Sequence, residues 1–361
     1  MTEVLATYFL PEFLHLLPVA CHPERAWIEQ ESDAWLSERA HSLFRDEAHS
    51  QKHIGYHVPW WLCLCYPHAA IARIIEIANF THAITLYDDL YSVLAGELVH
   101  ADLVGNASSR GKVKVAQLKG MLEGKCPDDP YIHLIDEAWQ SIQRGMTGQQ
   151  RDRFLAHLDA TIDALVTEAE LRKEDRLLDL EGYLHLKAIL DWSKIYILFT
   201  EYALGIELPH ELLTDPRFTD LSTAFSEHMV LVNDLLSYPM ELCDGDVLIN
   251  SITQLTRGKG ISLQEAVDAV VARVEHAESR FVALCDELRE ARVGQQAEVG
   301  IYLSELGYLL SGSVHFQRFC SRYRWEYGSW DDLPSGHVVI STSGVYVVAS
   351  SPYTHANGMI L

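Results

Sequence analysis

Adjacent aspartates that could bind a metal ion occur at Asp88–Asp89, Asp128–Asp129 and Asp331–Asp332. The second pair lies between two prolines in CPDDPY, which is typical of a turn and a helix start. The third pair, in SWDDLPS, precedes Pro334 and Gly336 and also indicates a turn. The first pair, in LYDDLYSVL, falls late in a long apolar segment with helical spacing, where a buried acid needs a partner. Either this segment positions a functional acid, or its end simply reaches solvent.

A second set of oxygen-bearing side chains lies in HMVLVNDLLSYPMELC, residues 228–243. Asn233, Ser237 and Glu241 follow one another at intervals of one helical turn, so on a helix they form a single strip. A side-chain amide, a hydroxyl and a carboxylate are hard oxygen ligands of the kind that Mg²⁺ accepts. Their apolar neighbours predict burial, where such groups otherwise lack a purpose. The alternative is a polar helix face with a satisfied asparagine.

A third element is the Arg–Tyr pair in RFCSRYRW, Arg322 and Tyr323. A guanidinium fork and a phenol together suit the oxygens of a phosphate. Combined with the two oxygen-rich segments, this pair indicates a site that binds a diphosphate through Mg²⁺.

The composition excludes several other classes of protein. The chain has 361 residues and a formal net charge of −23, which argues against a nucleic-acid or anionic-membrane partner. The first residues lack the basic flank and cleavage site of a signal peptide, and no uninterrupted apolar stretch is long enough for a membrane span. The seven cysteines form no CxxC pair, which favours reduced thiols. We therefore expect a cytoplasmic protein.

Apolar residues recur at helical spacing along almost the whole chain, so the sequence predicts an all-α fold. We expect one helical-bundle domain over residues 1–335, followed by a C-terminal extension over residues 336–361. The stretch GHVVISTSGVYVVAS alternates like a short hairpin, and the extension is either such a hairpin or a disordered tail. The expected helical stretches cover residues 22–46, 67–97, 133–169, 181–205, 222–241, 263–291 and 293–319.

These segments together resemble the class I terpene synthases of the bacterial and fungal single-domain type. YDDLYS is similar to their aspartate-rich motif, NDLLSYPME fits their (N/D)Dxx(S/T)xxxE motif in every defined position, and SRY fits their C-terminal Arg–Tyr pair. The order and approximate spacing also agree, and the resemblance spans nearly the whole chain. It implies the helical bundle of that family. The chain-elongating prenyltransferases differ, because they carry a second aspartate-rich motif.

The resemblance also implies particular roles for individual residues. Asp88 would bridge two ions of a trinuclear Mg²⁺ cluster, for which Mn²⁺ is a possible substitute, with Asp89 as outer support or minor ligand. Asn233, Ser237 and Glu241 would hold the third ion. The diphosphate would be bound by Arg322, Tyr323 and Lys187, which stands where the family has a diphosphate-sensing arginine, 46 positions before Asn233. Trp61, Trp192 and Phe316 are candidates for an aromatic pocket wall, although such residues are often plain core.

Several positions depart from the family pattern. Ser92 replaces the last acid of the first motif, and Met240 stands where many members have a basic residue that contacts the diphosphate. Pro239 is expected to kink its helix and to change the direction of Glu241. His82 and Thr85 take positions that are frequently aromatic, so we expect an unusually polar pocket wall.

The implied activity is that of a Mg²⁺-dependent terpene cyclase, a carbon–oxygen lyase of isoprenoid biosynthesis and secondary metabolism. Farnesyl diphosphate is the expected substrate and a sesquiterpene the expected product. The alternatives are a monoterpene-type cyclase acting on geranyl or methylated geranyl diphosphate, and a helical protein that binds prenyl diphosphates without cyclising them. The protein is expected to be a monomer or a homodimer.

Overall fold

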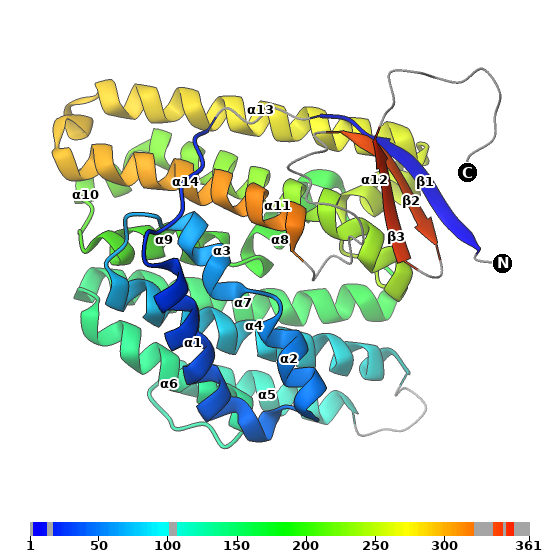
Figure 1. The fold of residues 1–361 in the computed structure, drawn as a ribbon, viewed down its shortest axis with the longest axis horizontal. Coiled ribbons are helices and arrows are strands. Elements are labelled where there is room, and N and C mark those ends of the chain that lie inside the picture. The colour runs from blue at the N-terminus through cyan, green and yellow to red at the C-terminus, as the bar shows by residue number, and fades with distance from the viewer. Residues whose placement is uncertain (1–2, 13–16, 101–106, 321–334, 342–343, 350–361) are drawn as a thin grey trace.

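The computed structural model describes residues 3–12, 17–100, 107–320, 335–341 and 344–349. Helices dominate this part of the chain, which confirms the expected all-α class, and they pack as one bundle (Figure 1). None of the described helices is long and apolar enough to cross a membrane. In chain order the helices are α1 (Arg25–Ala40), η1 (His41–Leu43), α2 (Glu47–Ile54), α3 (Val58–Cys65), α4 (Ile71–His100), α5 (Ala107–Leu122), α6 (Pro130–Gly145), α7 (Gly148–Glu174), α8 (Leu180–Leu190), α9 (Ser193–Leu204), α10 (His210–Leu213), α11 (Pro216–Asp244), α12 (Ser251–Lys259), α13 (Leu263–Glu290), η3 (Arg292–Gln295) and α14 (Ala297–Phe319).

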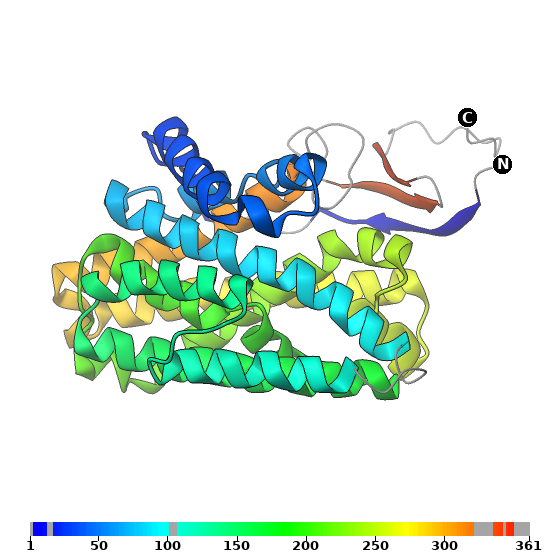
Figure 2. The same ribbon diagram turned by 90° about the horizontal axis from the view of Figure 1, so that it is seen from below.

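Helix α11 is the element around which one half of the bundle is organised. It packs against α13 along much of its length and also against α14, α8, α9 and α12. Most of its residues from Phe218 to Pro239 are buried, because its sequence is apolar on several faces. In the other half, α4 packs against α1, α3 and α6 (Figure 2). The cavity described below has α4 and α11 in its wall.

Local sequence signals explain where the main helices begin. Asp129 caps α6 by accepting hydrogen bonds from the backbone N–H groups of Tyr131 and Ile132, which confirms the helix start expected at CPDDPY. Thr147 with Gln150, and Ser262 with Glu265, form capping boxes at α7 and α13. The third aspartate pair lies outside the described residues.

Two of the expected helical stretches are in fact pairs of helices. Residues 133–169 divide at Met146–Thr147 into α6 and α7, and residues 181–205 divide at Asp191–Trp192 into α8 and α9. Trp192 adopts a left-handed backbone conformation with φ of 60°, which no helix interior accommodates. Apolar spacing continues across the second break, so the sequence pattern did not reveal it. At the first break, Gly145, Gly148 and the capping residue Thr147 are turn and helix-start signals that the prediction of one continuous helix did not use.

A three-stranded antiparallel sheet lies at one end of the bundle (Figures 1 and 2). It consists of β1 (Val4–Leu10), β2 (Gly336–Ser341) and β3 (Gly344–Ala349), with β2 in the middle. Strands β2 and β3 form a hairpin, and the N-terminal strand that joins it was not expected from the sequence. Gln264 of α13 anchors β1, because its side chain donates to Phe9 O and accepts from Phe9 N, both at 2.8 Å.

Candidate active site

A cavity of about 360 Å³ lies between the helices, and residues of α3, α4, α7, α8, α9, α11 and α14 line it. Its lining combines carboxylates, two cations and a set of aromatic side chains. Five carboxylates belong to it, namely Asp88, Glu168, Asp191, Glu241 and Asp246, against the two cations Arg172 and Lys187. The lining is therefore strongly acidic in the part of the chain that the structure describes.

The first aspartate pair contributes one acid to this cavity. Asp88 projects from α4 into the lining, next to Ile84 and Thr85 of the same stripe. The Asp89 carboxylate is directed elsewhere, since its Oδ2 lies 3.7 Å from Nδ1 of the buried His53 on α2. The two neighbouring acids thus face different surroundings.

The predicted strip on α11 forms as expected. Asn233, Ser237 and Glu241 all line the cavity, and Ser237 Oγ donates a 2.7 Å hydrogen bond to Glu241 Oε1. The helix continues through Pro239, and this bond holds Glu241 on the strip. Pro239 therefore does not remove Glu241 from the cavity lining.

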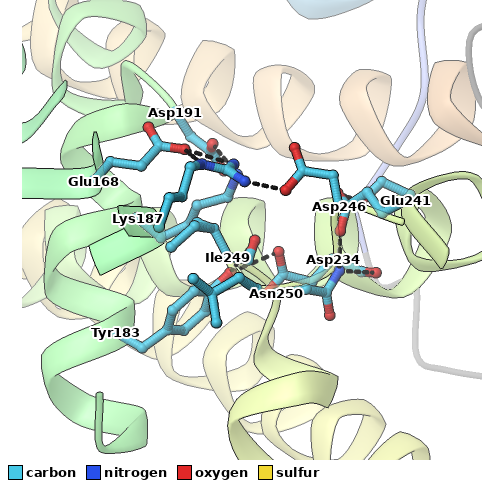
Figure 3. A network of polar contacts seen from close by, with 12 residues as sticks. Glu168, Tyr183, Lys187, Asp191, Asp234, Glu241, Asp246, Ile249 and Asn250 are labelled. Carbon is cyan, nitrogen blue, oxygen red and sulfur yellow. Dashed lines mark hydrogen bonds and ion pairs between the residues drawn. The ribbon is translucent and has the colours of Figure 1, made fainter. Parts of the chain in front are cut away.

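Asn250 holds the second oxygen of Glu241. Its Nδ2 donates to Glu241 Oε2 at 2.9 Å and to the backbone carbonyl of Asp234 at 3.0 Å. Its side-chain oxygen accepts from Ile252 N and caps α12. One fully buried asparagine therefore links Glu241 to the start of the next helix (Figure 3).

Asp234, the residue after Asn233, is fully buried behind the strip. It accepts hydrogen bonds from the Tyr183 hydroxyl at 2.7 and 2.9 Å and from Ser251 N at 2.9 Å (Figure 3). Burial raises the pKa of Asp234 to about 7; Lys187 opposes this rise and Glu241 adds to it. Asp234 thus acts as a buried acceptor that ties α8, α11 and α12 together.

Lys187 lines the cavity from α8 and forms an ion pair with Asp191 one turn later, with Nζ 3.0 Å from Oδ1. Burial by itself lowers the pKa of Lys187, but the carboxylates of Asp191, Asp234 and Glu241 outweigh it and raise the pKa above its ordinary value. The lysine is therefore a charged cation facing the α11 strip.

Arg172 is a second cation in the cavity lining, and its place there was not predicted from the sequence. It reaches the cavity from α7, and its guanidinium donates to Glu168 on the same helix and to Asp246 just beyond α11. Burial lowers its pKa, whereas these two carboxylates raise it, with a net rise. Its local sequence, ELRKEDR, is an ordinary charged helix end, and nothing in it distinguishes Arg172 from its neighbours.

Aromatic side chains form the rest of the wall. Trp61, Trp192 and Phe316 all line the cavity, together with Tyr196. The Trp61 ring lies edge-on to Tyr196 with centroids 5.1 Å apart, and its Nε1 donates to Ser313 Oγ. Thr85 is part of the lining, but His82 is wholly buried behind it with Nε2 3.3 Å from Asp33. The expected polar wall is therefore correct for Thr85 and wrong for His82.

The donor groups around the cavity fit a hard divalent cation. No cluster of at least three His, Cys, Asp or Glu residues suited to a metal occurs among the described residues. The oxygens come instead from two helices that line one cavity, one carboxylate from α4 and an amide, a hydroxyl and a carboxylate from α11. Ser237 and Glu241 already converge on one point, and burial raises the pKa of Glu241. A divalent cation beside Glu241 would favour the ionised carboxylate and so offset the free-energy cost of burying its charge. Arg322 and Tyr323 lie outside the described residues.

Comparison with known proteins adds independent information. The family model described as "Terpene synthase family 2, C-terminal metal binding" matches residues 79–280. The chain is 26% identical to (3S,6E)-nerolidol synthase of Selaginella moellendorffii, over 93% of this chain and 88% of that protein. It is 25% identical to Sesquiterpene synthase 1 of Postia placenta, over 85% of this chain and 87% of that protein. The crystal structure of germacradien-4-ol synthase from Streptomyces citricolor is similar in fold, with a TM-score of 0.71, 18% identity and coverage of 85% and 97% of the two chains.

Proposed function

Because the chain belongs to terpene synthase family 2, whose model describes a metal-binding domain, we propose that it is a Mg²⁺-dependent class I terpene cyclase. It ionises a linear isoprenyl diphosphate, cyclises the resulting carbocation and releases diphosphate. The observation that carries this proposal is the convergence of Asp88 with the Asn233–Ser237–Glu241 strip on one cavity that also contains Lys187. Two walls of oxygen ligands that face a common space suit a cluster of divalent ions between them.

In this proposal Asp88, Asn233, Ser237 and Glu241 hold the ions, and Asp89 supports Asp88 from outside the cavity. Bound Mg²⁺ would neutralise the diphosphate oxygens, so that the allylic carbon–oxygen bond breaks without a general acid. In the structure the Ser237 hydroxyl donates to Glu241. To bind an ion it would rotate, so that a lone pair of its oxygen faces the cavity. The acidic lining supports the binding of added cations, since among the described residues that line the cavity five carboxylates outnumber two basic side chains.

Cationic side chains complete the diphosphate site. Lys187 donates from α8, and Arg322 and Tyr323 are proposed to bind the same oxygens. Lysine keeps the charge of the family's arginine but presents no bidentate fork.

The aromatic wall is proposed to enclose the hydrocarbon. The faces of Trp61, Trp192 and Phe316 can stabilise positive charge and exclude water from the carbocation. We propose farnesyl diphosphate as the substrate, which the name of the Postia placenta relative supports. Geranyl or methylated geranyl diphosphate is the second candidate. We further expect the enzyme to act in the cytoplasm, where its cysteines stay reduced.

The proposal is tested by incubating the purified protein with geranyl, farnesyl and geranylgeranyl diphosphates, with and without Mg²⁺. Products are identified by gas chromatography and mass spectrometry. A cyclic hydrocarbon or alcohol from one substrate, lost with EDTA, establishes the activity and the chain length. Linear alcohols alone would indicate a diphosphate-hydrolysing protein, and no turnover would indicate a binding protein.

A further inference from the structure

Arg172 occupies a position in the cavity that no motif of the sequence assigns. It comes from α7, whereas Lys187 comes from α8, yet both line the same space (Figure 3 shows Lys187 with Glu168, Asp191, Asp246 and Glu241 around it). Its side chain is only 19% exposed, so its remaining exposed surface faces a confined space. An arginine that only stabilises a helix surface is normally far more open to solvent.

Two carboxylates hold the Arg172 guanidinium in place. Nε and Nη2 donate to Glu168 Oε1 at 2.9 and 2.7 Å, and Nη1 donates to Asp246 Oδ1. A guanidinium has five N–H groups, and these bonds use three of them, which leaves two for a ligand. The fork is therefore oriented before any substrate arrives, and its charge is balanced by acids that a diphosphate could displace or share.

The residue that precedes Glu241 in the sequence contributes no positive charge to the cavity. Met240, next to Glu241 on α11, lines the cavity with an uncharged side chain. Arg172 supplies a positive charge to the same cavity from another helix. Guanidinium groups match phosphate oxygens in a bidentate geometry that Lys187 cannot provide.

We propose that Arg172 binds the diphosphate of the substrate, and that Glu168 and Asp246 hold it in position until the diphosphate arrives. This inference rests on the proposed function and adds a substrate-binding residue to it. Glu168 keeps the fork aligned along α7, while Asp246 is the partner that competes with the diphosphate for the guanidinium. The acid at position 246 therefore weakens diphosphate binding, and the arginine strengthens it.

Arg172 and Asp246 are expected to change diphosphate affinity in opposite directions, and this difference provides the test. The probe is inorganic pyrophosphate with Mg²⁺, and its binding to the full chain is measured by calorimetry for Arg172→Gln, Arg172→Lys and Asp246→Asn. Arg257→Gln is the matched control, because Arg257 forms an ion pair with Asp175 at the exposed surface. Thermal unfolding of each variant shows whether the fold is kept.

The expected result is about tenfold weaker pyrophosphate binding for Arg172→Gln, an intermediate loss for Arg172→Lys, and equal or tighter binding for Asp246→Asn. Arg257→Gln should match the wild type. The proposal is overturned if Arg172→Gln binds within twofold of the wild type, or if Asp246→Asn weakens binding as much as Arg172→Gln does. That second result would make the pair a purely structural link between α7 and the end of α11.

If Arg172→Gln does not fold, Arg172→Lys and Asp246→Asn decide the question by the same criteria. A wild-type protein that binds Mg²⁺-pyrophosphate but forms no cyclic product would refute the proposed function and leave this inference standing. A wild-type cyclase whose pyrophosphate affinity is unaffected by Arg172→Gln would refute the inference alone.

Discussion

At the scale of single residues, Asp88 and Asp89 have different surroundings although they are adjacent. Asp88 lines the cavity, whereas Asp89 lies 3.7 Å from His53 on the side of α2. We therefore predict that Asp88→Asn lowers turnover at least about a hundredfold, because it removes a charge that we propose to bind the metal ions. Asp89→Asn should cost about tenfold or less, because it acts only through support of its neighbour. Steady-state kinetics at several Mg²⁺ concentrations measure both, and an equal or greater loss for Asp89→Asn would contradict the assignment.

The positions of the α11 residues could be predicted from sequence, whereas those of Arg172 and Asn250 could not. Asn233, Ser237 and Glu241 are placed together by the repeat of one helix, which is a local property. Arg172 meets Asp246 across 74 positions of the chain, and Asn250 meets Glu241 only because the chain turns back after α11. Such contacts depend on tertiary packing and leave no periodic signal.

At the scale of elements, the start of α12 is linked to Glu241. Asn250 caps that helix with its oxygen and donates to Glu241 with its nitrogen. We predict that Asn250→Ala lowers the free energy of unfolding by about 2 kcal/mol, because both the cap and a buried hydrogen bond are lost. It should also weaken Mg²⁺-pyrophosphate binding.

Asn250→Asp separates these two effects. An aspartate keeps the oxygen that caps α12 but removes the donor and places a like charge beside Glu241. Calorimetry should show a loss of Mg²⁺-pyrophosphate binding with a smaller loss of helix stability than in Asn250→Ala. If Asn250→Asp binds Mg²⁺-pyrophosphate like the wild type, Asn250 does not position Glu241.

The contact of α7 with α9 predicts a pH dependence of stability. Burial, with a contribution from the nearby Lys194 and Arg153, lowers the pKa of His157 to about 4, below the value of about 6.5 expected in an unfolded chain. Between these values the unfolded chain binds more protons, so the free energy of unfolding falls as the pH decreases from 6.5 towards 4. Between pH 7 and pH 5, the free energy of unfolding of His157→Gln should therefore fall by about 2 kcal/mol less than that of the wild type. Denaturant unfolding at the two pH values measures this, and parallel losses in both proteins would refute it.

At the scale of the whole molecule, residues Val4–Leu10 pair with Gly336–Ser341 in the three-stranded sheet. The alternation in residues 336–349 predicted paired strands, but the partner strand β1 lies more than 300 positions away, and no local pattern indicates such a pairing. By contrast, the all-α class could be predicted from the helical spacing of apolar residues, because each helical segment shows this spacing in its own sequence. The break at Asp191–Trp192 was missed because apolar spacing continues through it, whereas the break at Met146–Thr147 carried glycines and a capping residue that the prediction did not use.

The sheet is expected to stabilise the fold without shaping the product. Ile340 of β2 is completely buried in the cluster that contains α11 and α13 residues, and its own side chain does not line the cavity. Ile340→Ala should lower the free energy of unfolding by about 3 kcal/mol. The neighbouring Val339→Ala, on the more open face, should cost less. Denaturant unfolding and product analysis measure both effects, and a changed product profile with unchanged stability would contradict this role.

We propose that α4 and α11 together form one site for metal ions and diphosphate. The most direct measurement is a crystal structure of the protein with Mg²⁺ and pyrophosphate. We expect ions about 2.1 Å from oxygens of Asp88 on one side and of Asn233, Ser237 and Glu241 on the other, with pyrophosphate between these ions and Lys187. Pyrophosphate bound elsewhere, or ions that engage only one of the two walls, would contradict it.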